Sequence, residues 1–221
     1  MNRPNLLVSA AAMVAVLISA RVWAAELEHR TFAVRLDGNP AGEFRMTVQK
    51  LDDGSQLMAA QALLAAKRGG STWRYSYRAL ETWKGGRLQK FESHSEEDGK
   101  KRHLIAGLQD RGLRVNFNDR RHDVAPEAWT NTFWFVPTMA QRAQSVVLFD
   151  VETGKESTGM LEYLGTERRT VGSTEMECGH YRVRTGDYSA ELWFDASDRL
   201  VRRESAWYGY KMVLEMLKVQ K

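Results

Sequence analysis

Cysteine and proline are scarce in this chain of 221 residues, which holds one cysteine and four prolines. The lone cysteine, Cys178, cannot form a disulfide within the chain, and its neighbours make neither a C-x-x-C pair nor a nucleophile motif. We therefore expect Cys178 to be buried as a small apolar side chain. The shortage of proline leaves most backbone amides free to donate hydrogen bonds, which suits an uninterrupted β-sheet.

The familiar catalytic motifs and a strong charge excess are absent as well. The sequence has no G-x-S-x-G elbow, no H-E-x-x-H helix and no glycine-rich phosphate loop followed by Lys-Ser or Lys-Thr. We therefore assign no catalytic residue and predict no cofactor. The formal net charge of +4 falls to +2 without the N-terminal segment that holds Arg3 and Arg21, and so small an excess argues against a nucleic-acid partner.

One long apolar run is present, from Leu6 to Ala20, and Arg3 precedes it. The run is too short to cross a hydrocarbon core of about 30 Å comfortably, and it resembles the apolar part of a secretory signal. We predict cleavage between Ala24 and Ala25, with an uncleaved membrane anchor as the alternative.

Residues 1–24 are thus predicted to be a signal peptide, and residues 25–221 a single domain. That domain is expected in the periplasm or outside the cell, and it should not span a membrane after cleavage.

Alternation of apolar and polar residues dominates the rest of the chain. Phe32, Val34 and Leu36 alternate with polar residues in TFAVRLDG, and turn signals such as DDGS, KGGR and EDGK separate similar runs. This pattern predicts an all-β domain: a curved antiparallel sheet of roughly ten strands that forms a half-barrel or open barrel.

One segment, from Asn118 to Gln144, lacks this alternation and holds two prolines and several aromatic residues. A loop of this length in a compact domain usually covers something. We predict that it forms a lid over the concave side of the sheet, with one helical turn near Thr138 to Ala143.

Charge matches predict the register of three hairpins with turns at Asp98-Gly99, Gly186-Asp187 and Tyr208-Gly209. The pairs expected to face each other are Glu97 and Lys100, Glu96 and Lys101, Arg182 and Glu191, Tyr181 and Leu192, and Arg202 and Glu215.

The first of these hairpins also sets His94 opposite His103 at a site where side chains approach closely, with Glu92 and Glu96 nearby. Three interpretations remain open: a surface pair without a role, a pH-sensitive pair, or an open Zn²⁺ or Cu²⁺ site that uses both imidazoles and one of the acids.

A stripe of aromatic residues is the main candidate for ligand binding. Trp73, Tyr75, Tyr77 and Trp83 share one face of a predicted strand. They can form a packed inner face, a sugar-stacking platform or the wall of a cavity, because a tyrosine hydroxyl needs a polar partner. The predicted ligand-binding set adds two lid residues to these four: Trp129 and Trp134.

Two acids stand next to strand tryptophans and are the candidates for a catalytic acid. Glu81-Thr82-Trp83 and Glu191-Leu192-Trp193 each precede a turn and the pattern R-L-x-x-x-E-S. Apolar surroundings raise the pKa of a carboxyl group. A solvent-facing position for both acids is the simpler alternative.

Several stretches together resemble a family of exported bacterial β-proteins known only as a domain of unknown function. They are VRLDGNPAGEFRMTV, YSYRALETWKGGRLQKFES, NTFWF and YRVRTGDYSAELWFDASDRLVRRES. The stretch ELWFDASDRLVRRE is more distantly similar to periplasmic half-barrels that carry lipoproteins or other hydrophobic cargo. That similarity implies a curved sheet with a concave apolar face and a lid, and it implies no catalytic residue.

We therefore expect a periplasmic protein that binds or carries a hydrophobic, lipid-like molecule. An enzyme acting on a glycan or cell-envelope substrate is one alternative. An envelope assembly factor that binds another protein is the second.

Overall fold

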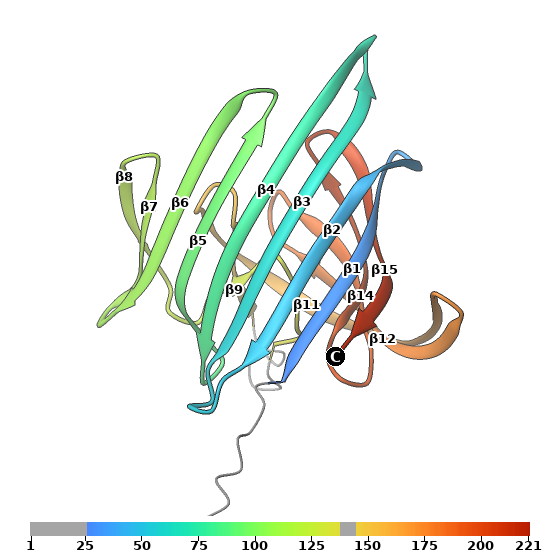
Figure 1. Cartoon of the computed structure of the whole chain (residues 1–221). Coiled ribbons are helices and arrows are strands. Elements are labelled where there is room, and N and C mark those ends of the chain that lie inside the picture. The colour runs from blue at the N-terminus through green and yellow to red at the C-terminus, as the bar shows by residue number, and fades with distance from the viewer. Residues whose placement is uncertain (1–25, 138–144) are drawn as a thin grey trace, which may run out of the picture.

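The computed structural model describes residues 26–137 and 145–221, and every helix or strand assigned in these ranges is a β-strand (Figure 1). The predicted signal peptide and the predicted helical turn near Thr138 to Ala143 lie outside the described residues. Nothing in the described part forms a helix with the length and apolar character needed to cross a membrane. The strands are β1 (Leu27–Leu36), β2 (Asn39–Lys50), β3 (Gln56–Arg68), β4 (Ser71–Lys84), β5 (Arg87–Glu97), β6 (Lys100–Gln109), β7 (Gly112–Phe117), β8 (Arg120–Val124), β9 (Trp129–Thr130), β10 (Ser145–Phe149), β11 (Glu156–Val171), β12 (Thr174–Arg184), β13 (Ser189–Phe194), β14 (Leu200–Trp207) and β15 (Tyr210–Gln220).

All described strands form one 15-stranded sheet in the order β8-β7-β6-β5-β4-β3-β2-β1-β15-β14-β13-β12-β11-β10-β9. Every pairing is antiparallel except that of β9 with β10. The first and last strands pair in the middle of the sheet, and the sheet curves so that β11–β14 lie behind β1–β5 (Figure 1). The predicted curved antiparallel fold is confirmed, but the predicted number of about ten strands is too low.

The three predicted hairpin registers are confirmed. His94 pairs with His103, Arg182 with Glu191 and Arg202 with Glu215. Two of the turns have positive φ at both central residues, 46° and 84° at Asp98-Gly99 and 50° and 81° at Tyr208-Gly209. This is the backbone of a type I′ turn, whose twist matches that of the strands it joins.

The alternation predicted from the sequence separates a buried inner face from an exposed outer face. On β4, Trp73, Tyr75, Tyr77 and Trp83 are all buried. Cys178 is fully buried as predicted, and burial raises the pKa of its thiol to about 11.

The segment predicted as a lid divides into parts. Residues 120–124 form the edge strand β8, so their predicted place in the lid is wrong. Four of the five side chains are exposed, and the sequence therefore shows no alternation there. Residues 125–137, the plug segment, enter the concave side and bury Trp129, Phe133 and Trp134. Arg30 Nη1 fixes this segment by donating to the backbone oxygen of Trp134 at 2.6 Å.

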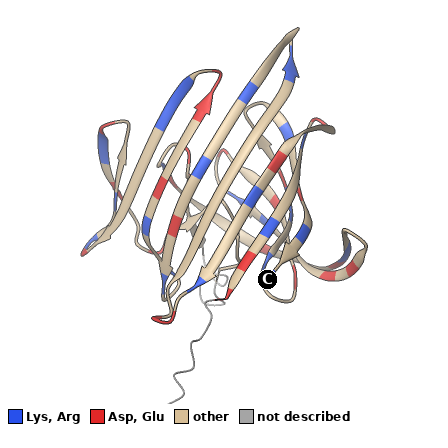
Figure 2. Ribbon diagram, viewed as in Figure 1, with Lys and Arg blue, Asp and Glu red and all other residues tan. Residues whose placement is uncertain are grey.

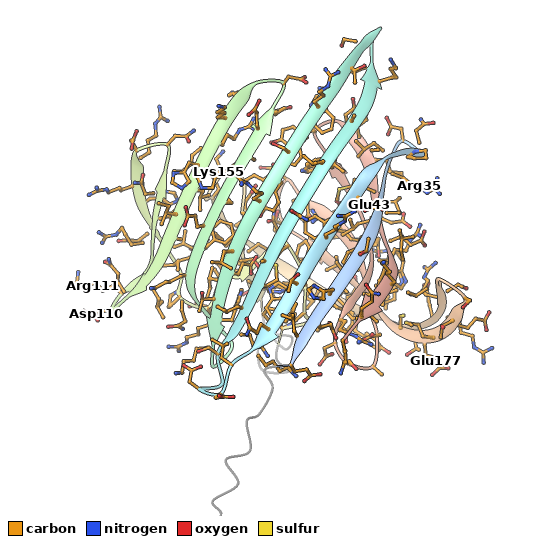
Figure 3. All side chains as sticks on the ribbon, viewed as in Figure 1. Arg35, Glu43, Asp110, Arg111, Lys155 and Glu177 are labelled. Atoms are coloured by element: carbon orange, nitrogen blue, oxygen red, sulfur yellow. The ribbon has the colours of Figure 1, made fainter. Side chains whose placement is uncertain are left out.

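The outer face carries charges of both signs, interspersed along the strands in the view of Figure 2. Charged residues also lie on the hairpins: Asp110 and Arg111 occupy the β6–β7 turn, and Glu177 lies in β12 on the β11–β12 hairpin, which projects from the body (Figures 1 and 3). Such mixed surface charge matches the small net charge of the sequence.

A bulge between β1 and β2 gives a test of the fold. Gly42 has a φ of 143°, and a Cβ there would lie 2.2 Å from the backbone oxygen of Leu63. We expect Gly42→Ala to lower the free energy of unfolding by about 2 kcal/mol or more, measured by urea denaturation. Gly107→Ala is the control, because a Cβ there meets nothing within 4 Å. Equal effects of the two changes would contradict this account of the bulge.

Candidate functional site

A pocket of about 390 Å³ lies on the concave side of the sheet. Tyr75 and Tyr77 line it from the N-terminal half of β4, Trp207 and Tyr208 line it from the β14–β15 hairpin, and residues 150–153 line it from the β10–β11 loop. Its volume falls within the range of roughly 300–1,000 Å³ that is usual for small-molecule sites.

One wall of the pocket is apolar. It is made by inward-facing side chains of β1, β2, β3 and β15, which meet because β1 pairs with both β2 and β15. The alternation of each strand aims these side chains at the same space. The wall consists of Val34, Phe44, Ala62, Leu64, Met212 and Leu214.

The β10–β11 loop brings a carboxyl group, that of Glu152, into an aromatic part of the lining. The hydroxyl of Tyr75 and the indole Nε1 of Trp207 both donate to Glu152 Oε1, the latter at 3.3 Å. The rings of Tyr75 and Trp207 meet edge to face with centroids 4.8 Å apart. Burial raises the pKa of the Glu152 carboxyl, so the site favours its neutral form more than water does.

A guanidinium group lines the same region. Arg203 lies on the inner face of β14, opposite Leu214. Its Nη1 donates to the backbone oxygen of Asn131 at 2.9 Å, and its Nη2 donates to the Tyr188 hydroxyl at 2.8 Å. Arg203 thereby joins β14 to the plug segment and brings a positive charge to the pocket wall.

Two lining residues carry a buried hydrogen-bonding atom without a partner in residues 26–137 and 145–221. These atoms are the hydroxyl of Tyr77 and Nη1 of Arg102. Buried polar atoms nearly always have partners, so unpaired ones at a pocket indicate groups that a ligand or water satisfies. Both groups can donate, so they favour a ligand with a hydrogen-bond acceptor.

The six aromatic residues predicted to bind a ligand lie in different parts of the structure. Tyr75 and Tyr77 line the pocket, whereas Trp73 packs beside it with its ring 5.6 Å from that of Trp207. Trp83 and Trp134 meet edge to face in the core with ring centroids 6.5 Å apart. The sixth residue, Trp129, packs against Phe133 within the plug segment at 4.6 Å.

Glu81, one of the two candidate acids, is fully buried beneath the plug segment. It accepts hydrogen bonds from Nε1 of Trp83 at 2.7 Å and of Trp134 at 3.0 Å, and from the hydroxyls of Thr132 at 2.8 Å and Thr130 at 3.0 Å. Burial raises the pKa of Glu81, and the four donors oppose that rise. Glu81 itself does not line the pocket, although Thr132, one of its four donors, does. Glu81 therefore belongs to a hydrogen-bond network in the core that reaches the pocket only through Thr132.

Glu191, the other candidate acid, is ion-paired with Arg182 and accepts from His180 Nε2 at 2.7 Å. Like Glu81, it lies outside the lining of the 390 Å³ pocket. Two acids do line it, Asp150 and Glu152, and neither was predicted as a site residue. Both lie in the loop between β10 and β11, where no strand pattern marks them. The sequence analysis also missed Arg203, although the predicted pairing of Arg202 with Glu215 already set Arg203 on the opposite face.

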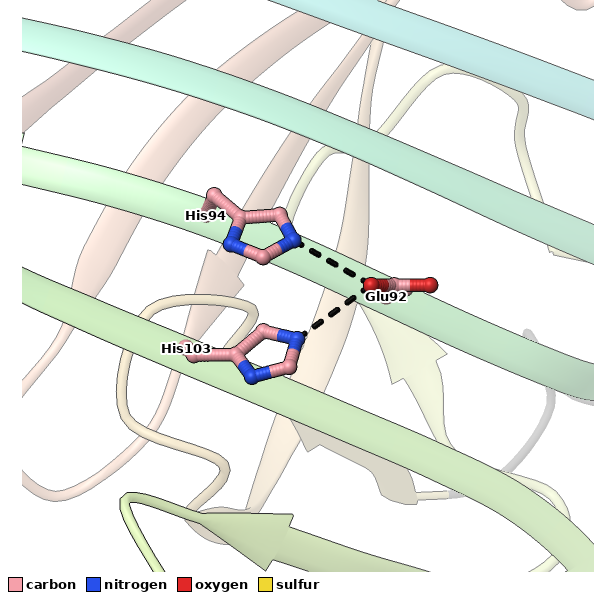
Figure 4. A group of neighbouring side chains, drawn as sticks. All are labelled: Glu92, His94 and His103. Carbon is pink, nitrogen blue, oxygen red and sulfur yellow. Dashed lines mark hydrogen bonds and ion pairs between the residues drawn. The ribbon is translucent and has the colours of Figure 1, made fainter.

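The predicted histidine pair forms a compact cluster with Glu92 on the outer face (Figure 4). The imidazoles of His94 and His103 stack with centroids 4.2 Å apart and an interplanar angle of 10°. Their Nε2 atoms lie 3.1 and 3.2 Å from the same oxygen, Oε1 of Glu92. Glu92 and Glu96 were both candidates for the acidic ligand. In the part of the chain that the structure describes, Glu92 lies beside the two imidazoles and Glu96 does not belong to the cluster.

Comparison with known proteins supports the fold. A crystal structure of a beta-barrel-like protein of domain of unknown function DUF1849 from Brucella abortus matches with a TM-score of 0.61 and 9% identity. The match covers 88% of this chain and 97% of that chain, and at such low identity it shows the fold alone. No curated protein matches the chain. The family model described as Domain of unknown function (DUF6134) matches residues 32–216, and the chain belongs to that family.

Proposed function

We propose that the protein binds a small amphipathic, lipid-like molecule in the pocket of about 390 Å³. The observation that carries this proposal is the pairing of an apolar wall with two unpartnered buried donors, Tyr77 Oη and Arg102 Nη1. An apolar body packs against the strands β1–β3 and β15, and a polar end with an acceptor atom faces the tyrosine and arginine side chains. Either donor gains a partner when its side chain turns toward a bound acceptor.

Export belongs to the same proposal. Residues 1–24 act as a signal peptide, and the domain that follows binds or carries its ligand in the periplasm or outside the cell. The apolar run from Leu6 to Ala20 with Arg3 before it supports this part.

The proposal is tested on protein that is expressed with its own N-terminal segment and purified from a bacterial periplasm. Native mass spectrometry should show a mass above that of the chain, and the same sample under denaturing conditions should show the chain without residues 1–24. Solvent extraction should then release an amphipathic molecule. A bare mass in the native spectrum, together with no binding of a fluorescent long-chain fatty acid, would reject the carrier function. A co-purifying protein in place of a lipid would favour the assembly-factor alternative.

Replacement of Tyr77 by phenylalanine tests whether its hydroxyl binds the ligand or stabilises the fold. The Tyr77 hydroxyl has no partner in the described structure, so Tyr77→Phe should leave the free energy of unfolding of the empty protein unchanged or slightly higher. Tyr75→Phe should lower it by about 1–2 kcal/mol, because it removes the bond to Glu152. We expect Tyr77→Phe to weaken binding of the fluorescent fatty acid several-fold. Unchanged affinity would remove Tyr77 from the binding site.

A further inference from the structure

The cluster of Glu92, His94 and His103 lies apart from the pocket, on the outer face of β5 and β6. All three side chains are about half exposed, with exposed fractions of 53%, 51% and 44%. Each offers one ligand atom, and these atoms lie within 4.8 Å of one another. We propose that this cluster is an open binding site for a transition-metal cation of the Zn²⁺ or Cu²⁺ type, independent of the proposed ligand pocket.

The sheet holds the two imidazoles together before any ion arrives. His103 uses its backbone amide and carbonyl on the β7 side: its N–H donates to Asn118 Oδ1 at 3.1 Å, and its C=O accepts from the Asn118 N–H at 3.2 Å. The pair with His94 is therefore of the non-hydrogen-bonded kind, in which opposite side chains approach most closely. Strand pairing thus places both rings side by side, so binding of an ion costs little conformational entropy of the side chains.

The distances suit a tetrahedral ion. A zinc ion with bonds of about 2.0–2.2 Å to nitrogen and oxygen holds neighbouring ligand atoms roughly 3.3–3.6 Å apart in a tetrahedron. The two Nε2 to Oε1 distances, 3.1 and 3.2 Å, lie just below the short end of that range, so a small outward movement of the side chains would admit the ion. Figure 4 shows both imidazoles turned toward the same carboxylate. A water molecule would complete the fourth position, as in other sites with three protein ligands.

The chemistry of the donors selects the class of ion. Imidazole nitrogen suits Zn²⁺ and Cu²⁺, whereas Ca²⁺ and Mg²⁺ take oxygen ligands. Leu80 and Ile105 flank Glu92 in the register on either side, so neither neighbour brings a charge to the site. Arg78 pairs with His94 from β4 and brings a positive charge nearby, which lowers the affinity to be expected.

Calorimetric titration with ZnCl₂ tests the site on the whole exported domain, without an affinity tag that contains histidine. The wild type should bind one equivalent of Zn²⁺. His94→Ala and His103→Ala should each weaken binding by at least about tenfold, in line with losses seen when groups around a metal are removed. His29→Ala is the matched control, because His29 is an exposed histidine on β1 that bonds to Thr47 and lies outside the cluster.

Thermal denaturation supplies the second readout. Zn²⁺ should raise the melting temperature of the wild type and of His29→Ala, because an ion that binds the folded state stabilises it. That rise should be absent in His94→Ala and His103→Ala, whose melting temperatures without metal show that they fold. Absence of binding by the wild type at millimolar Zn²⁺ would overturn the proposal, and so would equal binding by all four proteins. The outcome does not depend on whether the pocket binds a lipid, because the cluster shares no residue with it.

Discussion

Replacement of Glu81 by alanine is expected to lower the free energy of unfolding by about 4 kcal/mol or more. The change leaves two indole N–H groups, those of Trp83 and Trp134, without an acceptor in the core, and each buried unpaired donor costs about 1–3 kcal/mol. It also leaves a void beside Thr130 and Thr132. Urea denaturation measures the loss. Glu43→Ala is the control, because Glu43 is an exposed partner of Arg45, and such ion pairs contribute little.

Glutamine at the same position should be tolerated. Three short contacts join the Glu81 carboxyl, Thr132 and Thr130: Oε1 to Thr132 at 2.8 Å, Thr132 to Thr130 at 2.8 Å, and Thr130 to Oε2 at 3.0 Å. When the carboxylate is ionised, both hydroxyls donate to it and no hydrogen remains for the contact between Thr130 and Thr132. When it is protonated, Oε1 donates to Thr132, Thr132 donates to Thr130 and Thr130 donates to Oε2, so that the ring closes. A glutamine amide can donate in place of that proton. We therefore expect Glu81→Gln to stay within about 1 kcal/mol of the wild type.

The pH dependence follows from the same ring. Burial raises the folded-state pKa of Glu81 above its ordinary value of 4.5, so between these two pKa values the folded state binds more protons than the unfolded state. The contribution of Glu81 to stability is therefore full below pH 4.5 and falls as the pH rises through that window. The difference in unfolding free energy between wild type and Glu81→Gln should show this fall. A difference that is flat with pH, or a glutamine variant as unstable as the alanine variant, would contradict the neutral ring.

Much of the fold follows from local signals in the sequence. The registers of three hairpins were predictable because each hairpin pairs oppositely charged residues across its two strands. Each turn also contains a glycine, which tolerates positive φ, as Gly99 and Gly209 show. The number of strands was not predictable in the same way. Strand β8 has four exposed side chains out of five, and β9 has two residues, so neither produces an alternating pattern. Their strand conformation comes from neighbours in the sheet.

The candidate site was predictable to a lesser degree, because it depends on contacts between distant segments. Period-two spacing correctly sets Tyr75, Tyr77 and Trp83 on one face of β4. Whether such a residue lines a pocket or belongs to the core depends on which part of the inner face the plug segment covers. The plug segment packs against Trp83 through Trp134, whereas Tyr77 lines the pocket. Arg203, in contrast, could have been predicted. The register that pairs Arg202 with Glu215 sets Arg203 on the inner face of β14, and a charged residue on an apolar face indicates a functional site.

Filling the pocket should abolish ligand binding while the fold persists. Ala62 lies on β3, faces inward between Phe44 and Tyr77 in the register, and lines the pocket. An indole in place of its methyl group would occupy the space that we assign to the apolar body of the ligand. We expect Ala62→Trp to weaken binding of the fluorescent fatty acid by at least about a hundredfold, which corresponds to about 2.7 kcal/mol.

The cost of this substitution to stability should be small, because the new side chain enters a space of about 390 Å³ and not a packed core. The matched control is Leu63→Trp, the next residue on the same strand, whose side chain is 76% exposed on the outer face. That variant should bind the fatty acid like the wild type. If Ala62→Trp keeps its urea midpoint and still binds the fatty acid with unchanged affinity, the ligand does not occupy this pocket. If Ala62→Trp proves unstable, Leu64→Phe blocks the same wall from the next inward position on β3 and must give the same loss of binding.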